Sequence, residues 1–267
     1  MSWAHANGVR FHIQRLEPPA ATSTGKSGPV VVFVHGLVMD NLSSFYYTLA
    51  PSVVGVGGTA FLYDLRGHGR SGRPETGYAP DDAVCDLLAV LDAEGVHERV
   101  YLVGNSYGGL VAARVAVRAP HRVAGLVILE AECAGDGAAA WQEDMTNSLT
   151  VAALGLRRND VRGQLAVLGQ RKVARLAAGA DALLNGTTLI DDLATAGPLS
   201  PAELAQIECP VLAVYGERSE LIGGAEQLRT HVPDASIVVL PGMAHTVLRE
   251  ATGQLRELVL SWLDEHQ

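Results

Sequence analysis

The chain has 267 residues, of which 48% are hydrophobic and 18% charged, and its formal net charge at pH 7 is -9. This composition is typical of one globular α/β domain with room for an insertion. The negative net charge, without any run of Lys or Arg, argues against nucleic acid and anionic membrane surfaces as partners.

The predicted elements begin with a β-hairpin at 5–16, where polar and apolar residues alternate around an Asn-Gly turn signal. Continuous apolar runs at 29–36 and 59–67 are typical of parallel strands covered on both faces. Residues 81–96 carry apolar side chains at helical spacing. The alternation then continues through strand 99–105, helix 106–119, strand 122–130, strand 209–217, helix 224–232, strand 236–242 and helix 246–266. This order predicts a doubly wound, mainly parallel sheet.

One interval of about 80 residues, far longer than an ordinary loop, breaks this rhythm between the strands at 122–130 and 209–217. It is rich in Ala and Leu and contains helix-like pieces at 139–154 and 161–184. Because it leaves the C-terminal end of a central strand, where ligands bind in such sheets, we expect a helical cap over a site. A surface insertion without contact to a site is the alternative. The predicted domains are a core, 1–131 and 208–267, and a cap, 132–207.

The sequence from Gly104 to Gly108, GNSYG, fits the pattern G-x-S-x-G, with a predicted strand before it and a predicted helix after it. A sharp turn from strand into helix strains the serine backbone, and the two glycines remove side chains that would collide there. The Ser106 hydroxyl would then lie above the sheet edge, at a helix N-terminus that favours negative charge. Ser106 is therefore the candidate nucleophile, and a serine N-cap is the alternative.

The chain resembles the α/β-hydrolase superfamily over nearly its whole length. The resemblance is carried by four segments in that family's order and at about its spacing, namely 35–45 (HGLVMDNLSSF), 63–74 (YDLRGHGRSGRP), 104–109 (GNSYGG) and 241–250 (PGMAHTVLRE). It implies the α/β-hydrolase fold, a doubly wound and mainly parallel sheet of about eight strands with a helical cap inserted after the sixth strand. It also implies hydrolytic chemistry.

A serine hydroxyl needs a base, and the place of His245 after the last predicted strand resembles that of the family's catalytic histidine. His35 and His68 precede the serine and lie in glycine turns. The resemblance implies that both are scaffold residues that hold loops in place. The backbone N–H of Tyr107, directly after the nucleophile, is one expected oxyanion donor, and by resemblance that of Leu37 is the other. The remaining histidines are interpreted as surface or packing residues: His5, His12, His97, His121, His231 and His266.

The triad acid departs from the family pattern. The family usually carries an aspartate three residues after the glycine that ends the penultimate core strand, and this chain has Ser219 there. Glu130 closes the strand next to the nucleophile strand, where some family members place the acid, and a carboxylate at that edge is otherwise costly to bury. We favour Glu130 as the acid and keep Glu220 as the alternative, with Glu217 behind both. Asp64 is interpreted as a carboxylate that braces a turn.

These residues predict a serine hydrolase that cleaves an ester, thioester or lactone through an acyl-enzyme. An internal hydroxyl or amine in place of water would give cyclising chain release, and hydrolysis of a carbon–carbon bond stays open. Serine at the elbow disfavours the halide and epoxide chemistry of family members with an aspartate nucleophile. A ligand-binding protein without turnover is the alternative from another class, supported by the missing loop aspartate. Cofactor-free oxygen chemistry is more remote.

Trp141 and Met145 of the predicted cap could line an apolar pocket, which favours a small to medium, largely apolar acyl substrate; packing within the cap is the alternative. The sequence has no metal-ligand spacing and no nucleotide fingerprint, so we expect no metal and no cofactor. No apolar stretch approaches the roughly twenty residues that span a bilayer, and no signal peptide is expected. An odd number of distant cysteines predicts a cytoplasmic location without a disulfide framework. These cysteines are Cys85, Cys133 and Cys209.

Overall fold

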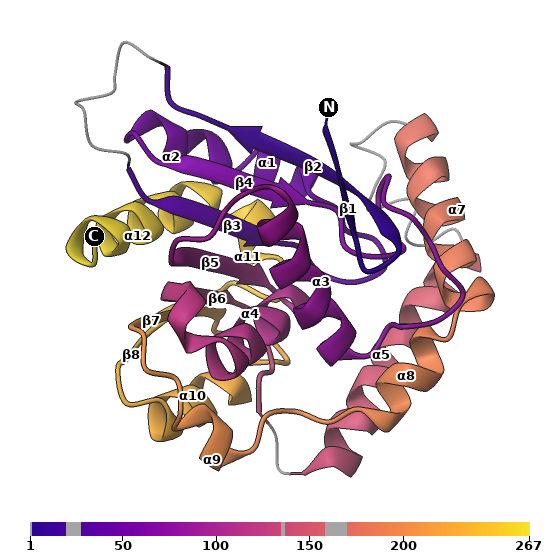
Figure 1. Cartoon of the computed structure of the whole chain (residues 1–267). Coiled ribbons are helices and arrows are strands. Elements are labelled where there is room, and N and C mark those ends of the chain that lie inside the picture. Colours follow the sequence, from indigo (N-terminus) through magenta and orange to yellow (C-terminus); the bar gives the residue numbers. More distant parts are fainter. Residues whose placement is uncertain (1, 20–27, 135–136, 158–169) are drawn as a thin grey trace.

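The structure, a computed structural model, describes residues 2–19, 28–134, 137–157 and 170–267 (Figure 1). Its strands are β1 (Ser2–Ala6), β2 (Val9–Leu16), β3 (Val30–Val34), β4 (Thr59–Tyr63), β5 (Val100–Asn105), β6 (Val123–Leu129), β7 (Val211–Gly216) and β8 (Ala235–Leu240). Within the described ranges they form one eight-stranded sheet in the order β1-β2-β4-β3-β5-β6-β7-β8. β1 and β2 form the predicted hairpin, β2 pairs with β4 antiparallel, and the strand pairs from β4 to β8 are parallel. The prediction of a doubly wound, mainly parallel sheet is confirmed.

Both faces of the sheet are covered by helices, which explains the continuous apolar strand runs. In β3, Val32 and Val34 face one hydrophobic layer, whereas Val31 and Phe33 face the other. The first layer contains α3 (Pro80–Ala93), α4 (Tyr107–Arg118) and α10 (Gly223–His231). The second contains α1 (Ser43–Tyr46), α2 (Ala50–Gly55), α11 (Val247–Glu250) and α12 (Thr252–Glu265).

The C-terminal helix differs from its prediction. The sequence predicts one helix over 246–266, and the structure divides it into α11 and α12. The division falls at Ala251, whose φ of -115° and ψ of 26° lie outside the helical region. The apolar side chains of both pieces still pack on the same face of the sheet, so the predicted amphipathic pattern is kept across the break.

The long interval between β6 and β7 is helical where it is described. It contains α5 (Ala138–Arg157), α7 (Gln170–Gly186), α8 (Leu189–Thr195) and α9 (Pro201–Leu204). Figure 1 shows α5, α7 and α8 together at one side of the molecule. The predicted helix over 161–184 is present from Gln170 onward, and its first part lies outside the described residues. The two ends of the interval meet, since the Leu199 N–H donates to the Cys133 carbonyl at 2.8 Å.

The α8 region is fixed to the core by hydrogen bonds. The Tyr78 N–H donates to Asp192 Oδ2 at 2.8 Å, and the Thr188 N–H donates to the carbonyl of Glu75 at the same distance. Tyr78 and Glu75 belong to the segment between β4 and α3, which leaves the same sheet edge as the interval itself. These bonds hold the α8 region against the segment that leads from the C-terminal edge of the sheet into α3.

Candidate active site

The turn between β5 and α4 presents the candidate nucleophile. β5 ends at Asn105 and α4 begins at Tyr107, so Ser106 alone makes the turn, with φ 54° and ψ -124°. Few residues that carry a side chain adopt this conformation, which costs free energy. The Ser106 side chain makes no cap hydrogen bond to α4, which argues against the N-cap alternative. The Ser106 N–H donates to the Leu129 carbonyl at 2.8 Å, which ties the turn to the end of β6.

The glycines of the turn meet a steric requirement. A Cβ atom on Gly104 would lie 2.3 Å from the carbonyl oxygen of Gly108. One on Gly108 would lie 2.0 Å from the carbonyl oxygen of Val34, at the end of β3. Real Cβ atoms do not approach backbone so closely. The helix can therefore start this close to the strands only with glycine at both positions.

Glu130 lies beside the candidate base. It directly follows β6, is fully buried and has a positive φ of 51°. Its carboxylate accepts hydrogen bonds from the Gly216 N–H, the Ser219 hydroxyl and His245 Nδ1, the last at 3.3 Å. The structure thus brings the favoured acid and the predicted base together. These donors also compensate the carboxylate for the loss of water.

The other candidate acids lie in more open positions. Glu220 is exposed, and its charge acts on His245 through space, more weakly than that of Glu130. Glu217 is exposed as well, and it accepts a hydrogen bond from the Gly242 N–H at 2.8 Å. Among the described residues, Glu130 is the carboxylate that hydrogen-bonds to the His245 ring. The geometry therefore favours Glu130 as the partner of His245.

His245 is poised as a base. The hydrogen bond with Glu130 raises the pKa of His245 above its usual 6.5, although partial burial opposes the rise. With Nδ1 donating to Glu130, Nε2 carries the lone pair that can accept a proton. Within the described residues Ser106 makes no hydrogen bond to this ring, and such a contact often tightens only when substrate binds.

We expect activity to depend on pH through His245. The base must be neutral to take a proton, so kcat/KM should rise with pH through a pKa above 6.5. Glu130→Gln removes the group that raises this pKa and leaves the opposing effect of burial. The rise of kcat/KM should therefore occur at lower pH in this variant. Measuring kcat/KM against pH for both proteins checks this expectation. A wild-type kcat/KM that rises with a pKa below 6.5 would contradict it.

The two expected oxyanion donors are available. Among the described residues, the N–H groups of Leu37 and Tyr107 donate to no other protein atom. The residues on either side of Leu37 are held: the Gly36 N–H donates to Asp40 Oδ2 at 2.8 Å, and the Val38 N–H donates to His68 Nε2 at 2.9 Å.

The loop that carries Leu37 lies close to the nucleophile. A Cβ on Gly36 would be 3.5 Å from that of Ser106. The fixed neighbours of Leu37 and this closeness give the loop the rigidity that preorganised donors need.

His35 and His68 hydrogen-bond to the backbone of neighbouring loops, as the resemblance implies. His35 Nε2 accepts from the Leu65 N–H at 2.9 Å, and its Nδ1 donates to the Gly36 carbonyl at 2.7 Å. His68 Nδ1 donates to the Arg66 carbonyl at 2.8 Å. Burial lowers the pKa of His68 to about 3, so it stays neutral and can accept a hydrogen bond at Nε2. These contacts connect the loops after β3 and β4.

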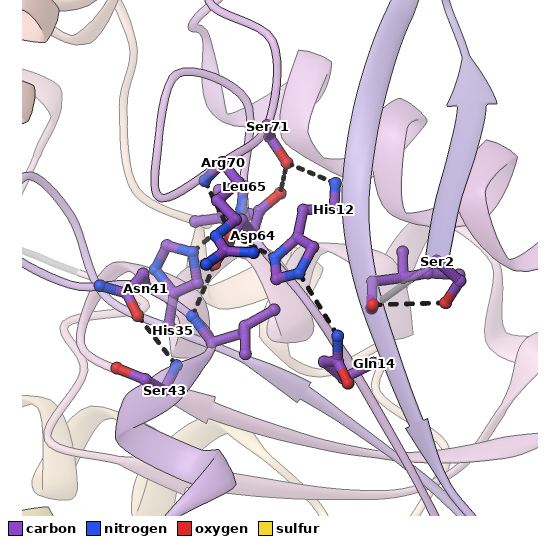
Figure 2. Close-up of polar contacts among 12 residues, drawn as sticks. Ser2, His12, Gln14, His35, Asn41, Ser43, Asp64, Leu65, Arg70 and Ser71 are labelled. Carbon is purple, nitrogen blue, oxygen red and sulfur yellow. Dashed lines mark hydrogen bonds and ion pairs between the residues drawn. The ribbon is translucent and has the colours of Figure 1, made fainter.

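Asp64 is the centre of a second polar cluster, shown in Figure 2. Its buried carboxylate accepts from the Leu42 N–H, the Arg70 N–H and the His12 ring at 2.8–2.9 Å. Burial alone would raise the pKa of Asp64, but the hydrogen bonds from His12 and from the two N–H groups hold it below 3.8. The sequence predicts His12 as a surface or packing residue. In the structure it is buried and hydrogen-bonded to Asp64, which lies in the turn that covers this face of β2.

Asp64→Asn is expected to lower the free energy of unfolding by about 2–4 kcal/mol at pH 7, because buried N–H donors lose a charged acceptor. A lowered pKa contributes stability above the unfolded value of 3.8, and this contribution disappears as pH falls through the folded value. The gap between wild type and variant in urea unfolding should therefore shrink below about pH 4. An exposed control, Asp264→Asn, should unfold like the wild type. A difference in unfolding free energy between wild type and Asp64→Asn that stays the same in acid would contradict a stabilising role of the Asp64 charge.

Trp141 and Met145 lie in α5, and Trp141 is fully buried. Both pack with the hydrophobic cluster that contains Leu189 and Leu193 of α8. The structure thus places them in the packing of the helical interval. Their contact with a substrate stays a prediction.

A cleft of about 460 Å³ opens between β2, the loops after β3 and β4, and α7. Its lining includes the polar residues Asn41, Tyr46 and Arg73. None of the three residues predicted for the triad lines it. In the described part of the chain, this cleft is therefore distinct from the candidate triad.

Three further findings concern cofactors, thiols and membranes. No group of three or more His, Cys, Asp or Glu side chains that could hold a metal ion occurs within the described ranges. The three cysteines are free, and burial raises the pKa of Cys133 to about 12 and that of Cys209 to about 11. Those two thiols are therefore protonated at neutral pH. None of the described helices is long and apolar enough to cross a membrane.

A family model described as the alpha/beta hydrolase family matches residues 31–258. The chain belongs to this family. The match includes the elbow, Glu130 and His245, and it confirms the resemblance carried by the four sequence segments. The sheet order and the helices on both faces of this α/β hydrolase agree with it.

This α/β hydrolase is 33% identical to epoxide hydrolase B of Mycobacterium tuberculosis over 135 residues, 50% of the chain and 36% of that protein. It is 34% identical to a putative non-heme haloperoxidase of Mycobacterium phage D29 over 109 residues, 41% of the chain and 38% of that protein. The matches thus span well under half the length of these relatives. The solved enol-lactonase from Burkholderia xenovorans aligns with a TM-score of 0.73 at 19% identity, covering 98% of this chain and 100% of that one. That likeness shows the fold alone.

Proposed function

We propose that this α/β hydrolase is a serine hydrolase that cleaves an ester, thioester or lactone through an acyl-enzyme. The observation that carries the proposal is the hydrogen bond between buried Glu130 and His245. The strained turn at Ser106 is tied to the same strand end, since its N–H donates to the carbonyl of Leu129, directly before Glu130. A carboxylate that orients an imidazole is the device that activates a serine hydroxyl. The chain order of serine, then glutamate, then histidine is the one this fold uses.

In the proposed reaction, Ser106 Oγ attacks the substrate carbonyl carbon while His245 Nε2 takes its proton. The developing oxyanion accepts hydrogen bonds from the N–H groups of Leu37 and Tyr107. The Glu130 side chain accepts the Nδ1–H and stabilises the imidazolium. The imidazolium then protonates the leaving group, and His245 activates a water molecule that hydrolyses the acyl-enzyme in the same way.

We further propose that residues 132–207 form a cap on a core of 1–131 and 208–267. The hydrogen bonds that fix the α8 region to the sheet edge support a cap. Relatives named as an esterase and a carbamate hydrolase support hydrolysis in general. Serine at the nucleophile position favours acyl chemistry over epoxide opening. The proposed substrate is a small to medium, largely apolar acyl compound, with water or an internal nucleophile as acceptor, and the proposed location is the cytoplasm.

A ligand-binding protein without turnover is the alternative from another class. The feature that favoured it was Ser219, at the position where an aspartate is usual. Glu130 offers a carboxylate to His245 from the neighbouring strand, so this feature no longer favours a binding protein. Hydrolysis of a carbon–carbon bond would use the same residues and remains the second candidate reaction.

A fluorophosphonate probe tests the proposal, because it reacts with serines that a base and an oxyanion site activate. We expect labelling of the wild type and none of Ser106→Ala. Ser261→Ala, at an exposed serine of α12, is the matched control and should be labelled like the wild type. A folded wild type that does not react would support the binding protein instead.

A further inference from the structure

Ser219 stands where the family usually has its acid, and it touches the acid that replaces it. It lies in the turn after β7 and is buried. Its N–H donates to the Gly216 carbonyl at 3.1 Å, and its Oγ accepts from the Leu221 N–H at 3.2 Å. The hydroxyl proton is donated to Glu130 Oε2, since a carboxylate oxygen accepts. The turn therefore gives the hydroxyl a defined direction.

The two oxygens of the Glu130 carboxylate have different partners. Oε1 accepts from the Gly216 N–H, and Oε2 accepts from the Ser219 hydroxyl and from His245 Nδ1. Two donors from one turn therefore fix the plane of the carboxylate, with Oε2 facing the imidazole. A catalytic base needs its orienting partner held to a fraction of an ångström. The hydrogen bonds from Gly216 and Ser219 to the Glu130 carboxylate supply that constraint.

We propose that Ser219 is the positioning residue of the triad acid, because its hydroxyl holds Glu130 Oε2 against His245 Nδ1. The inference rests on the proposed function, which gives Glu130 and His245 their roles. Ser219 Oγ and His245 Nδ1 both lie within hydrogen-bond reach of the same oxygen. An aspartate side chain in place of that of Ser219 would therefore extend into the space that the Glu130 carboxylate fills.

Among the described residues, two carboxyl groups act on His245. Glu130 acts through its hydrogen bond, and exposed Glu220 acts through space. Glu220 is kept in every variant below, so its contribution is constant. Any change in the titration of His245 then reports on position 130 or position 219.

The hydroxyl is tested by two substitutions at one position. Ser219→Ala should lower kcat on an aryl ester about tenfold, with KM within about twofold, because it loses one hydrogen bond behind the triad. Ser219→Thr keeps a hydroxyl and should retain most of the wild-type kcat. A wild-type kcat in folded Ser219→Ala would overturn the role of Ser219.

A carboxylate introduced at position 219 tests whether this position reaches the space at Glu130 Oε2. In the wild-type background, Ser219→Asp should lower kcat, because two carboxylates would share one buried space. In the Glu130→Ala background, the same substitution should raise kcat at least about tenfold, because the introduced carboxylate can then accept the Nδ1–H of His245. A residue with a merely structural role would not produce opposite effects in the two backgrounds. A folded double variant no faster than Glu130→Ala would overturn the placement of Ser219 beside the acid.

Titration of the His245 ring by NMR needs no turnover. Ser219→Ala should raise the pKa of His245 further, because Oε2 loses a donor that shares its negative charge. Glu130→Ala should lower the pKa, and adding Ser219→Asp should raise it again. If these changes in the pKa of His245 occur although the wild type hydrolyses no ester, the positioning role of Ser219 is supported and the proposed function is wrong. Unchanged titration in the folded variants would overturn the inference even where the wild type hydrolyses esters.

Discussion

Replacing Glu130 by glutamine is expected to lower kcat by about 10⁴-fold, the loss seen when a triad acid is neutralised. Glutamine keeps the volume of the buried side chain and removes its charge. The imidazolium that forms at His245 then loses its counter-charge, and an amide donor can face Nδ1, which favours the wrong tautomer. The Ser219 hydroxyl and Gly216 N–H also lose a charged acceptor, so the ring is held less firmly.

Glu220→Gln is the matched control, because it removes the same charge at an exposed position near the same histidine. It should change kcat by less than about fivefold, since an exposed charge that acts through water contributes roughly 1 kcal/mol or less. The measurement is kcat on a generic aryl ester, with circular dichroism to confirm folding. A large loss in Glu220→Gln together with an active Glu130→Gln would move the acid to the loop.

Gly108→Ala is expected to lower the free energy of unfolding by at least about 3 kcal/mol. The new Cβ would lie 2.0 Å from the carbonyl oxygen of Val34 and 2.7 Å from that of His35. Both are backbone atoms at the end of a central strand, so a side-chain rotation cannot relieve the contact. Either α4 or β3 has to move, and movement of α4 displaces Ser106 as well.

Gly253→Ala supplies the control for Gly108→Ala. Gly253 lies in α12, and nothing lies within 4 Å of the position that its Cβ would take. Alanine has the better helix propensity, so this variant should be more stable by about 0.5 kcal/mol. Urea unfolding at neutral pH measures both. A Gly108→Ala protein within about 1 kcal/mol of the wild type would mean that the elbow does not need the close approach to β3.

The elbow and the fold could be predicted because their physical requirements are local in sequence. The sharp turn at Ser106 demands glycine at two fixed offsets, and the flanking strand and helix are visible as apolar patterns. The alternation of strands and helices then leaves few topologies, and the doubly wound sheet is one of them. The hairpin was predictable for the same reason, since Asn7 and Gly8 mark its turn.

The partners of the acid other than His245 could not be predicted, because they depend on contacts across the sheet. Glu130 and His245 are 115 positions apart, and the sequence alone leaves open which glutamate the imidazole meets. The contact from Ser219 depends in addition on the direction of one hydroxyl. His12 was interpreted as a surface or packing residue because the alternation in the hairpin carries no information about the turn that covers it.

β5 and β6 are neighbours in register up to Asn105 and Leu129, and the candidate nucleophile and acid are the residues that follow them. The two groups are thus fixed by one pair of central strands. The turn after β7 then has to supply only two uncharged donors, from Gly216 and Ser219. Residues 220–223 therefore need not supply a charge, although the Leu221 N–H donates to Ser219 Oγ and the Leu221 and Ile222 side chains pack on the core. We expect uncharged substitutions at exposed Glu220 to leave the proton-transfer pair intact.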